Sequence, residues 1–263
     1  MGPPPESSSS AVHRREAPAP PLEAGLAAAR QQVERAAERA RETLYTFGEE
    51  LAHGLTHGIG AVLAIAGLAG LVAKAAVWGG TREIVVASIF GASLVLMYTA
   101  STLFHAIPLP ALPNTKRVLR VIDHCLIYVL IAGTYTPFTL LTLHDPPYAP
   151  WGWSLFGFVW GLAAVGIAFK IFTTGRFEAI SLTIYLLMGW CGLVAVQPLL
   201  HALAVPGLWL LLAGGLCYSF GVAFYLWERL RYHHAIWHAC VLAGSACHYF
   251  AVLLYVLPGP SAR

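Results

Sequence analysis

Apolar residues dominate the chain from Ile59 onward, and they fall into seven runs, each about as long as a bilayer-spanning helix. A helix crosses the hydrocarbon core of a membrane with roughly 20 predominantly apolar residues. Short groups of Gly, Pro, Asn and charged residues separate the runs, as turn chemistry predicts. The predicted spans are residues 59–79, 84–105, 121–143, 151–172, 178–199, 204–227 and 235–257. We therefore predict an all-α fold, a seven-transmembrane helix bundle.

The composition agrees with a membrane protein rather than a soluble domain. Of the 263 residues, 57% are apolar and only 11% are charged, which is too hydrophobic for a soluble domain of this size. The five cysteines lie in apolar runs without a CxxC pair. They therefore indicate small buried side chains rather than disulfides or thiolate metal ligands.

The first part of the chain has a different character. Residues 1–22 are rich in Pro, Ser and Ala and lack an apolar core, which predicts a disordered tail. Residues 23–47 mix Ala, Glu and Arg with scattered large apolar residues, which predicts an amphipathic cytoplasmic helix. The remaining segment, residues 48–258, forms the predicted membrane domain.

The basic residues of the short loops predict the orientation of the bundle, because cytoplasmic loops carry an excess of Lys and Arg. The third and fifth loops have no Lys or Arg. The second, fourth and sixth loops carry Lys116, Arg117 and Arg120, then Lys170 and Arg176, then Arg229 and Arg231. We therefore expect the N-terminus inside and the C-terminus outside.

With this orientation, polar residues from three distant segments reach the inner ends of their helices. Ser101 and His105 end the second span, Asp123 begins the third, and His234 and His238 begin the seventh. Polar side chains in membrane helices are costly unless they face other helices, water or a metal. Their convergence at one depth predicts a functional site.

The spacing of the histidines favours a metal. Two histidines four residues apart on a helix lie on one face and can bind the same ion, as His234 and His238 would. Catalytic zinc usually keeps three protein ligands and one water, so His105, His234 and His238 could supply the ligands. Asp123 could then accept a proton from the water or orient it, and Ser101 could bond the water or a substrate oxygen.

The residues themselves leave alternatives open. His53 and His57 have the same four-residue spacing and could form a rival pair, or they could lie at the lipid headgroups. Ser101 could instead bond the backbone of its own helix, and Asp123 could pair with Arg120.

Several segments together resemble the hemolysin III family, the bacterial branch of a group that includes the progestin and adipoQ receptors and, more distantly, the alkaline ceramidases. The resemblance covers about residues 45–257. It rests on Glu49–Gly60, on the SxxxH motif from Ser101 to His105, on Asp123-His124, and on the HxxxH motif from His234 to His238 with His248. One position departs from the family pattern: His53 stands where the family commonly has Asn. A further metal contact or a proton-transfer role for His53 is therefore an alternative.

The resemblance implies a seven-helix fold with the N-terminus inside and a Zn²⁺ site near the cytoplasmic leaflet. It implies that His105, His234 and His238 bind the zinc and that Ser101 and Asp123 lie beside the bound water. It also implies a bacterial inner or plasma membrane location. A zinc-dependent, ceramidase-like hydrolase of lipid amides or esters is the expected function.

Two other functions are weighed against this expectation. The first is a non-enzymatic membrane regulator or pore-forming hemolysin in which zinc is structural. The second is a proton or ion transporter, because His248 would lie about 15 Å deeper along its helix than His238. In each case we expect a membrane lipid as substrate or ligand and no nucleic-acid partner.

Overall fold

The computed structural model describes residue 2 and residues 21–107, 112–174 and 177–259. All regular structure in these ranges is helical. The elements are α1 (Pro21–Trp78), α2 (Thr81–Ala106), α3 (Pro113–Pro137), η1 (Phe138–Thr142), α4 (Ala149–Thr173), α5 (Glu178–Trp190), η2 (Cys191–Ala195), α6 (Val196–Ala202), α7 (Val205–Leu226), α8 (His233–Ala251) and η3 (Val252–Val256). The predicted disordered tail lies almost entirely outside the described residues, and so does Arg176.

The chain divides into two compact units, Met1–Phe47 and Gly48–Arg263. In the first unit the described backbone from residue 21 to residue 47 is the helical first part of α1. The amphipathic face predicted there stays a prediction. Within the described ranges, the spans long and apolar enough to cross a membrane all lie in the second unit.

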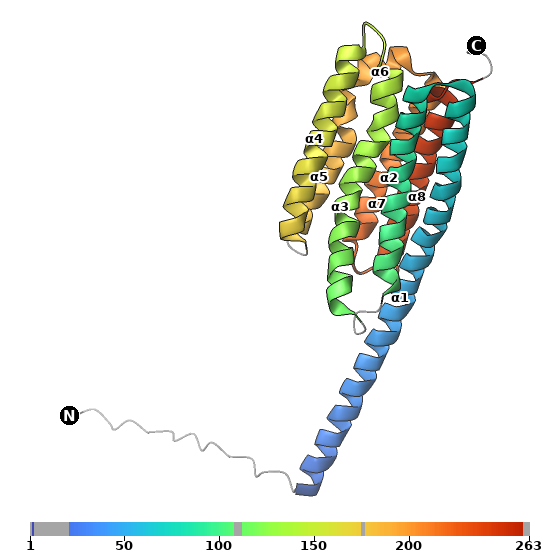
Figure 1. Cartoon of the computed structure of the whole chain (residues 1–263). Coiled ribbons are helices and arrows are strands. Elements are labelled where there is room, and N and C mark those ends of the chain that lie inside the picture. The colour runs from blue at the N-terminus through green and yellow to red at the C-terminus, as the bar shows by residue number, and fades with distance from the viewer. Residues whose placement is uncertain (1, 3–20, 108–111, 175–176, 260–263) are drawn as a thin grey trace. The chain divides into compact units, whose positions relative to one another are not determined.

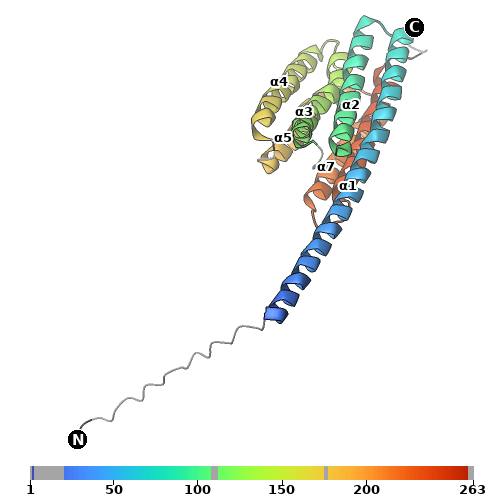
Figure 2. The same cartoon turned by 60° about the horizontal axis from the view of Figure 1, so that its bottom comes forward.

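The prediction of a seven-helix membrane bundle is confirmed. The described residues contain seven candidate spans, which are Gly48–Trp78, Thr81–Ala106, Asn114–Thr142, Ala149–Thr173, Glu178–Ala202, Val205–Leu226 and His233–Val256. In Figures 1 and 2 the helices of this unit run side by side, with α4 and α2 on opposite sides of α3.

The first span differs from the sequence prediction at its start. It begins at Gly48 rather than near Ile59, so His53 and His57 lie inside a continuous helix and not before it. The onset of an apolar run marks where a helix begins to face lipid, whereas backbone hydrogen bonds continue through polar residues that face neighbouring helices. His57 is only 1% exposed and is therefore packed inside the bundle.

Proline and local helix changes interrupt two spans. Pro137 ends α3, and the π-helical turn η1 continues the span to Thr142. The fifth span passes from α5 through the 3₁₀ turn η2 into α6. Such interruptions free backbone groups that neighbouring helices and side chains must satisfy. The hydroxyl of Tyr135 does so here, because it accepts from the amide N–H of Gly192 and donates to the carbonyl oxygen of Gly189.

Two apolar clusters hold the bundle together. One contains Leu71 of α1, Phe90 of α2 and Val241 of α8, and the other contains Tyr128 of α3, Val159 of α4 and Met188 of α5. Helix α1 approaches α2 closely at Gly60, where an added Cβ would lie 2.8 Å from the ring of Tyr98. This close approach brings the polar first turns of the span, including His53 and His57, against α2 and α8.

Candidate metal centre

Four imidazoles meet at the end of the bundle where α8 begins, and we refer to His53, His105, His234 and His238 as the histidine cluster. The ligand atoms of His53, His105 and His234 lie within 4.8 Å of one another. The ring centroid of His238 lies 4.6 Å from that of His234 and 5.1 Å from that of His105. The predicted convergence of α2 and α8 is therefore observed, and α1 adds a fourth histidine.

Helical periodicity explains how α1 reaches the cluster. Glu50, His53 and His57 are spaced three and four residues apart, so they share one face of the helix. The ring of His57 stacks on that of His238, with centroids 3.5 Å apart and an interplanar angle of 10°. The spacing of His53 and His57 is evident in the sequence, but the position of Glu50 on the same face follows only once α1 is known to be helical before Ile59.

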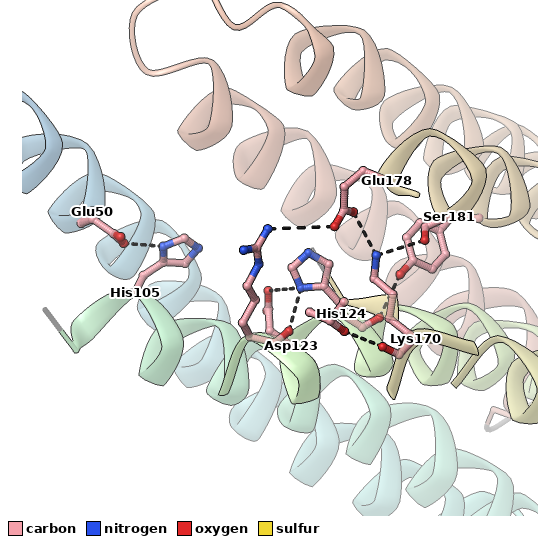
Figure 3. Close-up of polar contacts among 10 residues, drawn as sticks. Glu50, His105, Asp123, His124, Lys170, Glu178 and Ser181 are labelled. Carbon is pink, nitrogen blue, oxygen red and sulfur yellow. Dashed lines mark hydrogen bonds and ion pairs between the residues drawn. The ribbon is translucent and has the colours of Figure 1, made fainter. Parts of the chain in front are cut away.

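Glu50 holds His105 from outside the cluster (Figure 3). The Nδ1 atom of His105 lies 2.7 Å from Glu50 Oε2. On the other side of the carboxylate, Lys116 Nζ lies 2.7 Å from Glu50 Oε1. Because the carboxylate accepts the Nδ1 proton, the Nε2 lone pair of a neutral His105 is left for a metal. Neither Glu50 nor Lys116 could be found from sequence spacing alone, since their contact depends on where α1 meets α3.

Several buried ring nitrogens in the cluster and in the adjacent His57 lack hydrogen-bond partners among the described residues. They include His53 Nε2, His105 Nε2 and both ring nitrogens of His57. An unsatisfied buried polar atom is unfavourable, and a bound ion is one reason for such an atom to persist. Imidazole nitrogens at this spacing, with one of them oriented by a carboxylate, are a donor set that fits zinc.

Ser101 and Asp123 lie beside the cluster, and the alternative partners considered for them are not observed. Ser101 Oγ and Asp123 Oδ1 are buried and have no hydrogen-bond partner in the described part of the chain. Asp123 Oδ2 lies 3.7 Å from His124 Nδ1, whereas Arg120 points its guanidinium toward Glu178 at 4.0 Å. The two side chains lie near each other, and each has a polar atom that makes no close hydrogen bond to a described residue.

A cavity of about 700 Å³ begins at this site. Ser101, Asp123, His234 and His238 line it together with many apolar side chains of α3, α5, α7 and α8. This volume lies in the ordinary range for small-molecule and cofactor sites. The cavity is mostly apolar and carries polar groups at its histidine end and at several deeper positions, which suits an amphipathic molecule.

A second buried polar group, which we call the lysine cluster, joins α4 to α5 and consists of Lys170, Glu178 and Ser181 (Figure 3). Lys170 is completely buried. Its Nζ lies 2.9 Å from Glu178 Oε2 and 3.0 Å from Ser181 Oγ. The sequence predicts Lys116 and Lys170 in cytoplasmic loops. In the structure both are buried and each pairs with a carboxylate.

The fold and the site define a class: a multi-pass membrane protein with a buried histidine cluster at one end of an apolar cavity. The family model described as "Haemolysin-III related" matches residues 45–249. The chain therefore belongs to the haemolysin III family, and the resemblance seen in the sequence is confirmed.

The relatives support the same assignment. The chain is 47% identical to Hemolysin-3 of Bacillus cereus over 81% of its own length and 94% of that protein. It is 46% identical to the Hemolysin-3 homolog of Bacillus subtilis over 82% of its length and 99% of that protein. It is 30% identical to the human Monocyte to macrophage differentiation factor, over 68% of its length and 74% of that protein. With its seven apolar spans and bacterial relatives, it is a multi-pass protein of the bacterial membrane.

Proposed function

We propose that the protein is a zinc-dependent hydrolase that cleaves lipid amides or esters inside the membrane. One observation carries the proposal: histidines that could hold a metal, a buried carboxylate with one unbonded oxygen and a buried hydroxyl meet at one end of a mostly apolar cavity. A lipid in the cavity would bring its polar linkage to this end. The ceramidase-like reaction class comes from the family resemblance and is an analogy.

We propose His105, His234 and His238 as the zinc ligands. His105 is oriented by Glu50, and the other two share one face of α8. The Nδ1 atom of His238 lies 3.4 Å from the hydroxyl of Thr56 and 3.4 Å from the carbonyl oxygen of His53. Contacts on Nδ1 leave Nε2 of His238 for a metal. His53 is the rival third ligand, because its ligand atom groups with those of His105 and His234.

Bound zinc would polarise the scissile carbonyl and activate water at neutral pH. Asp123 has a role that its surroundings support: the residue lines the cavity and its Oδ1 has no hydrogen-bond partner among the described residues, so the carboxylate could accept a proton. Ser101 can donate its hydroxyl proton to a substrate oxygen. The apolar walls of the cavity would hold the acyl chain and exclude bulk water from the reacting end.

We also propose that the histidine cluster lies toward the cytoplasm, with the N-terminus inside and the C-terminus outside. Arg117, Arg120, Arg229 and Arg231 support this orientation. Reporter domains fused after Arg120 and after Arg263 should lie on opposite sides of the membrane, and the same side for both would overturn the orientation.

A second function is favoured by a specific observation. The ring centroid of His53 lies 4.8 Å from that of His105, 4.7 Å from that of His234 and 5.5 Å from that of His238. Four histidines could therefore fill all four positions of a tetrahedral ion, and such closed sites are typical of structural zinc. In that case the protein would be a non-enzymatic regulator, or a pore-former as the name Hemolysin-3 of its Bacillus cereus relative suggests.

The replacement Asp123→Asn separates these functions. It keeps the size of the side chain but removes the proton acceptor, so turnover of ceramide or phospholipid should fall by roughly 10²-fold or more. The zinc content and the melting temperature should stay close to wild type. The measurement is product release by purified protein in lipid, with zinc quantified in the same sample.

Asp145→Asn is the matched control, because Asp145 is exposed and lies outside the membrane spans. It should leave turnover unchanged. A zinc-loaded wild-type protein that releases no product from a panel of ceramides and phospholipids would contradict the hydrolase proposal for those substrates. Undiminished turnover in Asp123→Asn would contradict the role of Asp123.

A further inference from the structure

A second set of polar side chains lies deeper in the bundle than the histidine cluster. Tyr98 of α2 donates its hydroxyl proton to Ser245 Oγ of α8 at 2.7 Å, and the hydroxyl of Tyr218 of α7 lies 2.8 Å from the same oxygen. His248 follows one turn later on α8 and is 7% exposed. Polar groups at this depth in a membrane protein are expensive and therefore indicate a function or a missing partner.

The hydrogen bonds satisfy the hydroxyl groups but leave one atom of His248 without a partner. His248 Nε2 lies 3.3 Å from the carbonyl oxygen of Leu211. A carbonyl can only accept, so Nε2 carries the proton and Nδ1 of the neutral ring is an acceptor. His248 Nδ1 is buried and has no hydrogen-bond partner in the described part of the chain.

The ring of His248 is held firmly between α7 and α8. A Cβ atom at Gly214 would lie 2.6 Å from His248 Nε2, so only glycine allows α7 to approach the ring this closely. The ring of Tyr218 lies on another side, with its centroid 5.6 Å from that of His248. The position of the acceptor is therefore set by the fold rather than by a flexible side chain.

His248 and Tyr218 line the same cavity that begins at Ser101, Asp123 and His238. His248 follows His238 by ten residues on α8, which corresponds to about 15 Å along the helix axis. Between these two levels the lining includes the apolar residues Val222 and Val241 and the polar residues Tyr218 and Ser219. The cavity thus has a polar end and deeper polar positions, of which His248 is the one with an unpaired ring nitrogen among the described residues.

We propose that His248 and Tyr218 form a deep subsite for a lipid whose hydrocarbon chain carries a hydroxyl or amide N–H group. That group would donate a hydrogen bond to His248 Nδ1, about 15 Å along α8 from the level of the histidine cluster. This inference rests on the lipid-binding cavity of the proposed function. It adds a preference among lipids: chains with a mid-chain donor are favoured over plain chains of the same length.

The test compares two fatty acids that differ only at mid-chain. Stearate bearing a mid-chain hydroxyl and plain stearate compete with a fluorescent fatty acid for the purified wild-type protein in phosphatidylcholine nanodiscs. The hydroxylated chain can donate a hydrogen bond to His248 Nδ1, whereas plain stearate leaves this acceptor unpaired. The hydroxylated chain should therefore bind about fivefold more tightly than plain stearate. The variant His248→Phe keeps a ring but has no acceptor, so it should bind both chains with equal affinity.

One control variant and one control ligand test whether the preference depends on His248 and on the mid-chain position of the hydroxyl. His201→Phe removes a histidine from α6, where it lines a separate hollow with Tyr148, and should keep the fivefold preference. Stearate hydroxylated beside its carboxylate should bind wild type and His248→Phe alike, because that hydroxyl does not reach the subsite.

The possible outcomes distinguish the deep subsite from the lipid cavity as a whole. Measurable but equal affinity of wild type for the two chains would overturn the subsite and leave the lipid cavity standing, and this comparison needs no variant. A preference that survives in a folded His248→Phe protein would also overturn the role of His248. Binding of neither chain to wild type would overturn the lipid cavity and the subsite together.

Discussion

The histidine cluster and the lysine cluster are both buried polar groups inside a membrane bundle, yet they differ in how their atoms are satisfied. Lys170 Nζ has both a carboxylate and a hydroxyl partner within 3.0 Å. In the histidine cluster, His53 Nε2 and His105 Nε2 are buried without partners among the described residues. A satisfied buried ion pair can serve as a fixed structural contact, whereas unsatisfied donors and acceptors indicate a site for a ligand.

The two clusters also differ in the residues that hold them in place. Glu178 also lies 4.0 Å from Arg120, so the lysine cluster ties α3, α4 and α5 to one another. The histidine cluster is held from outside by Glu50, whose second oxygen pairs with Lys116. The comparison predicts that changes in the lysine cluster affect stability, and that changes in the histidine cluster affect metal binding.

The largest expected effect comes from Lys170→Met. It removes the nearest cation of Glu178, which lies 2.9 Å away. Because the Glu178 side chain is 32% exposed and Arg120 lies 4.0 Å from it, the loss of stability should be about 2–3 kcal/mol, at or below the lower end of the range for a buried ion pair. The zinc content of the folded fraction should not change. Unfolding in a denaturing detergent series, with zinc measured on the remaining folded protein, would check both expectations.

Two variants sharpen this first prediction. Lys74→Met is the matched control, because Lys74 Nζ donates to the carbonyl oxygen of Leu253 and its loss leaves no charge behind. The double variant Lys170→Met/Glu178→Gln should recover much of the lost stability. A Lys170→Met protein that is as stable as wild type, or one that loses zinc while staying folded, would break the distinction between the clusters.

A smaller effect is expected from Glu50→Gln. It keeps the shape of the side chain but weakens the contact that orients His105, and loss of such an outer contact typically lowers metal affinity 10- to 100-fold. Zinc competition with a chelating dye would measure the change. Because the same change leaves the buried Lys116 without its carboxylate, stability without metal should also fall, so the zinc affinity is measured on the folded protein.

Glu49→Gln provides the control for Glu50. The neighbouring carboxylate of Glu49 accepts from the backbone N–H of Tyr232 and is not a partner of His105. Its replacement should leave zinc affinity close to wild type. Equal losses of affinity in the two variants would mean that the charge near the site matters and the contact with His105 does not.

The number of helices and the main candidate site residues could be predicted from the sequence, because each prediction depends on a short stretch of residues read in order along the chain. Apolar runs of span length define the helices, and short breaks between them determine at which end each polar residue lies. This was enough to bring Ser101, His105, Asp123 and the two α8 histidines to one end of the bundle. Their proximity is observed, and their roles stay proposals.

Other parts of the site depend on contacts between helices that are distant in the sequence, and the spacing of residues within one helix does not predict such contacts. The start of the first span was missed because Glu50, His53 and His57 interrupt the apolar pattern while facing other helices. A charge near a turn usually faces solvent, so the sequence predicts Lys170 in a loop. Its burial depends on Glu178, which lies on the next helix and cannot be paired with it from the sequence. The deep pairing of Tyr98 with Ser245 likewise requires the register of α2 against α8.

The most direct test of the account is an experimental structure of the purified protein with anomalous scattering measured at the zinc absorption edge. We predict one zinc peak within the histidine cluster, at about 2.0–2.1 Å from three imidazole nitrogens and with one position open to the cavity. No peak at the cluster in protein purified without chelators would contradict the metal site. A peak bound by all four histidines, including His53, would contradict the hydrolase and support a structural ion.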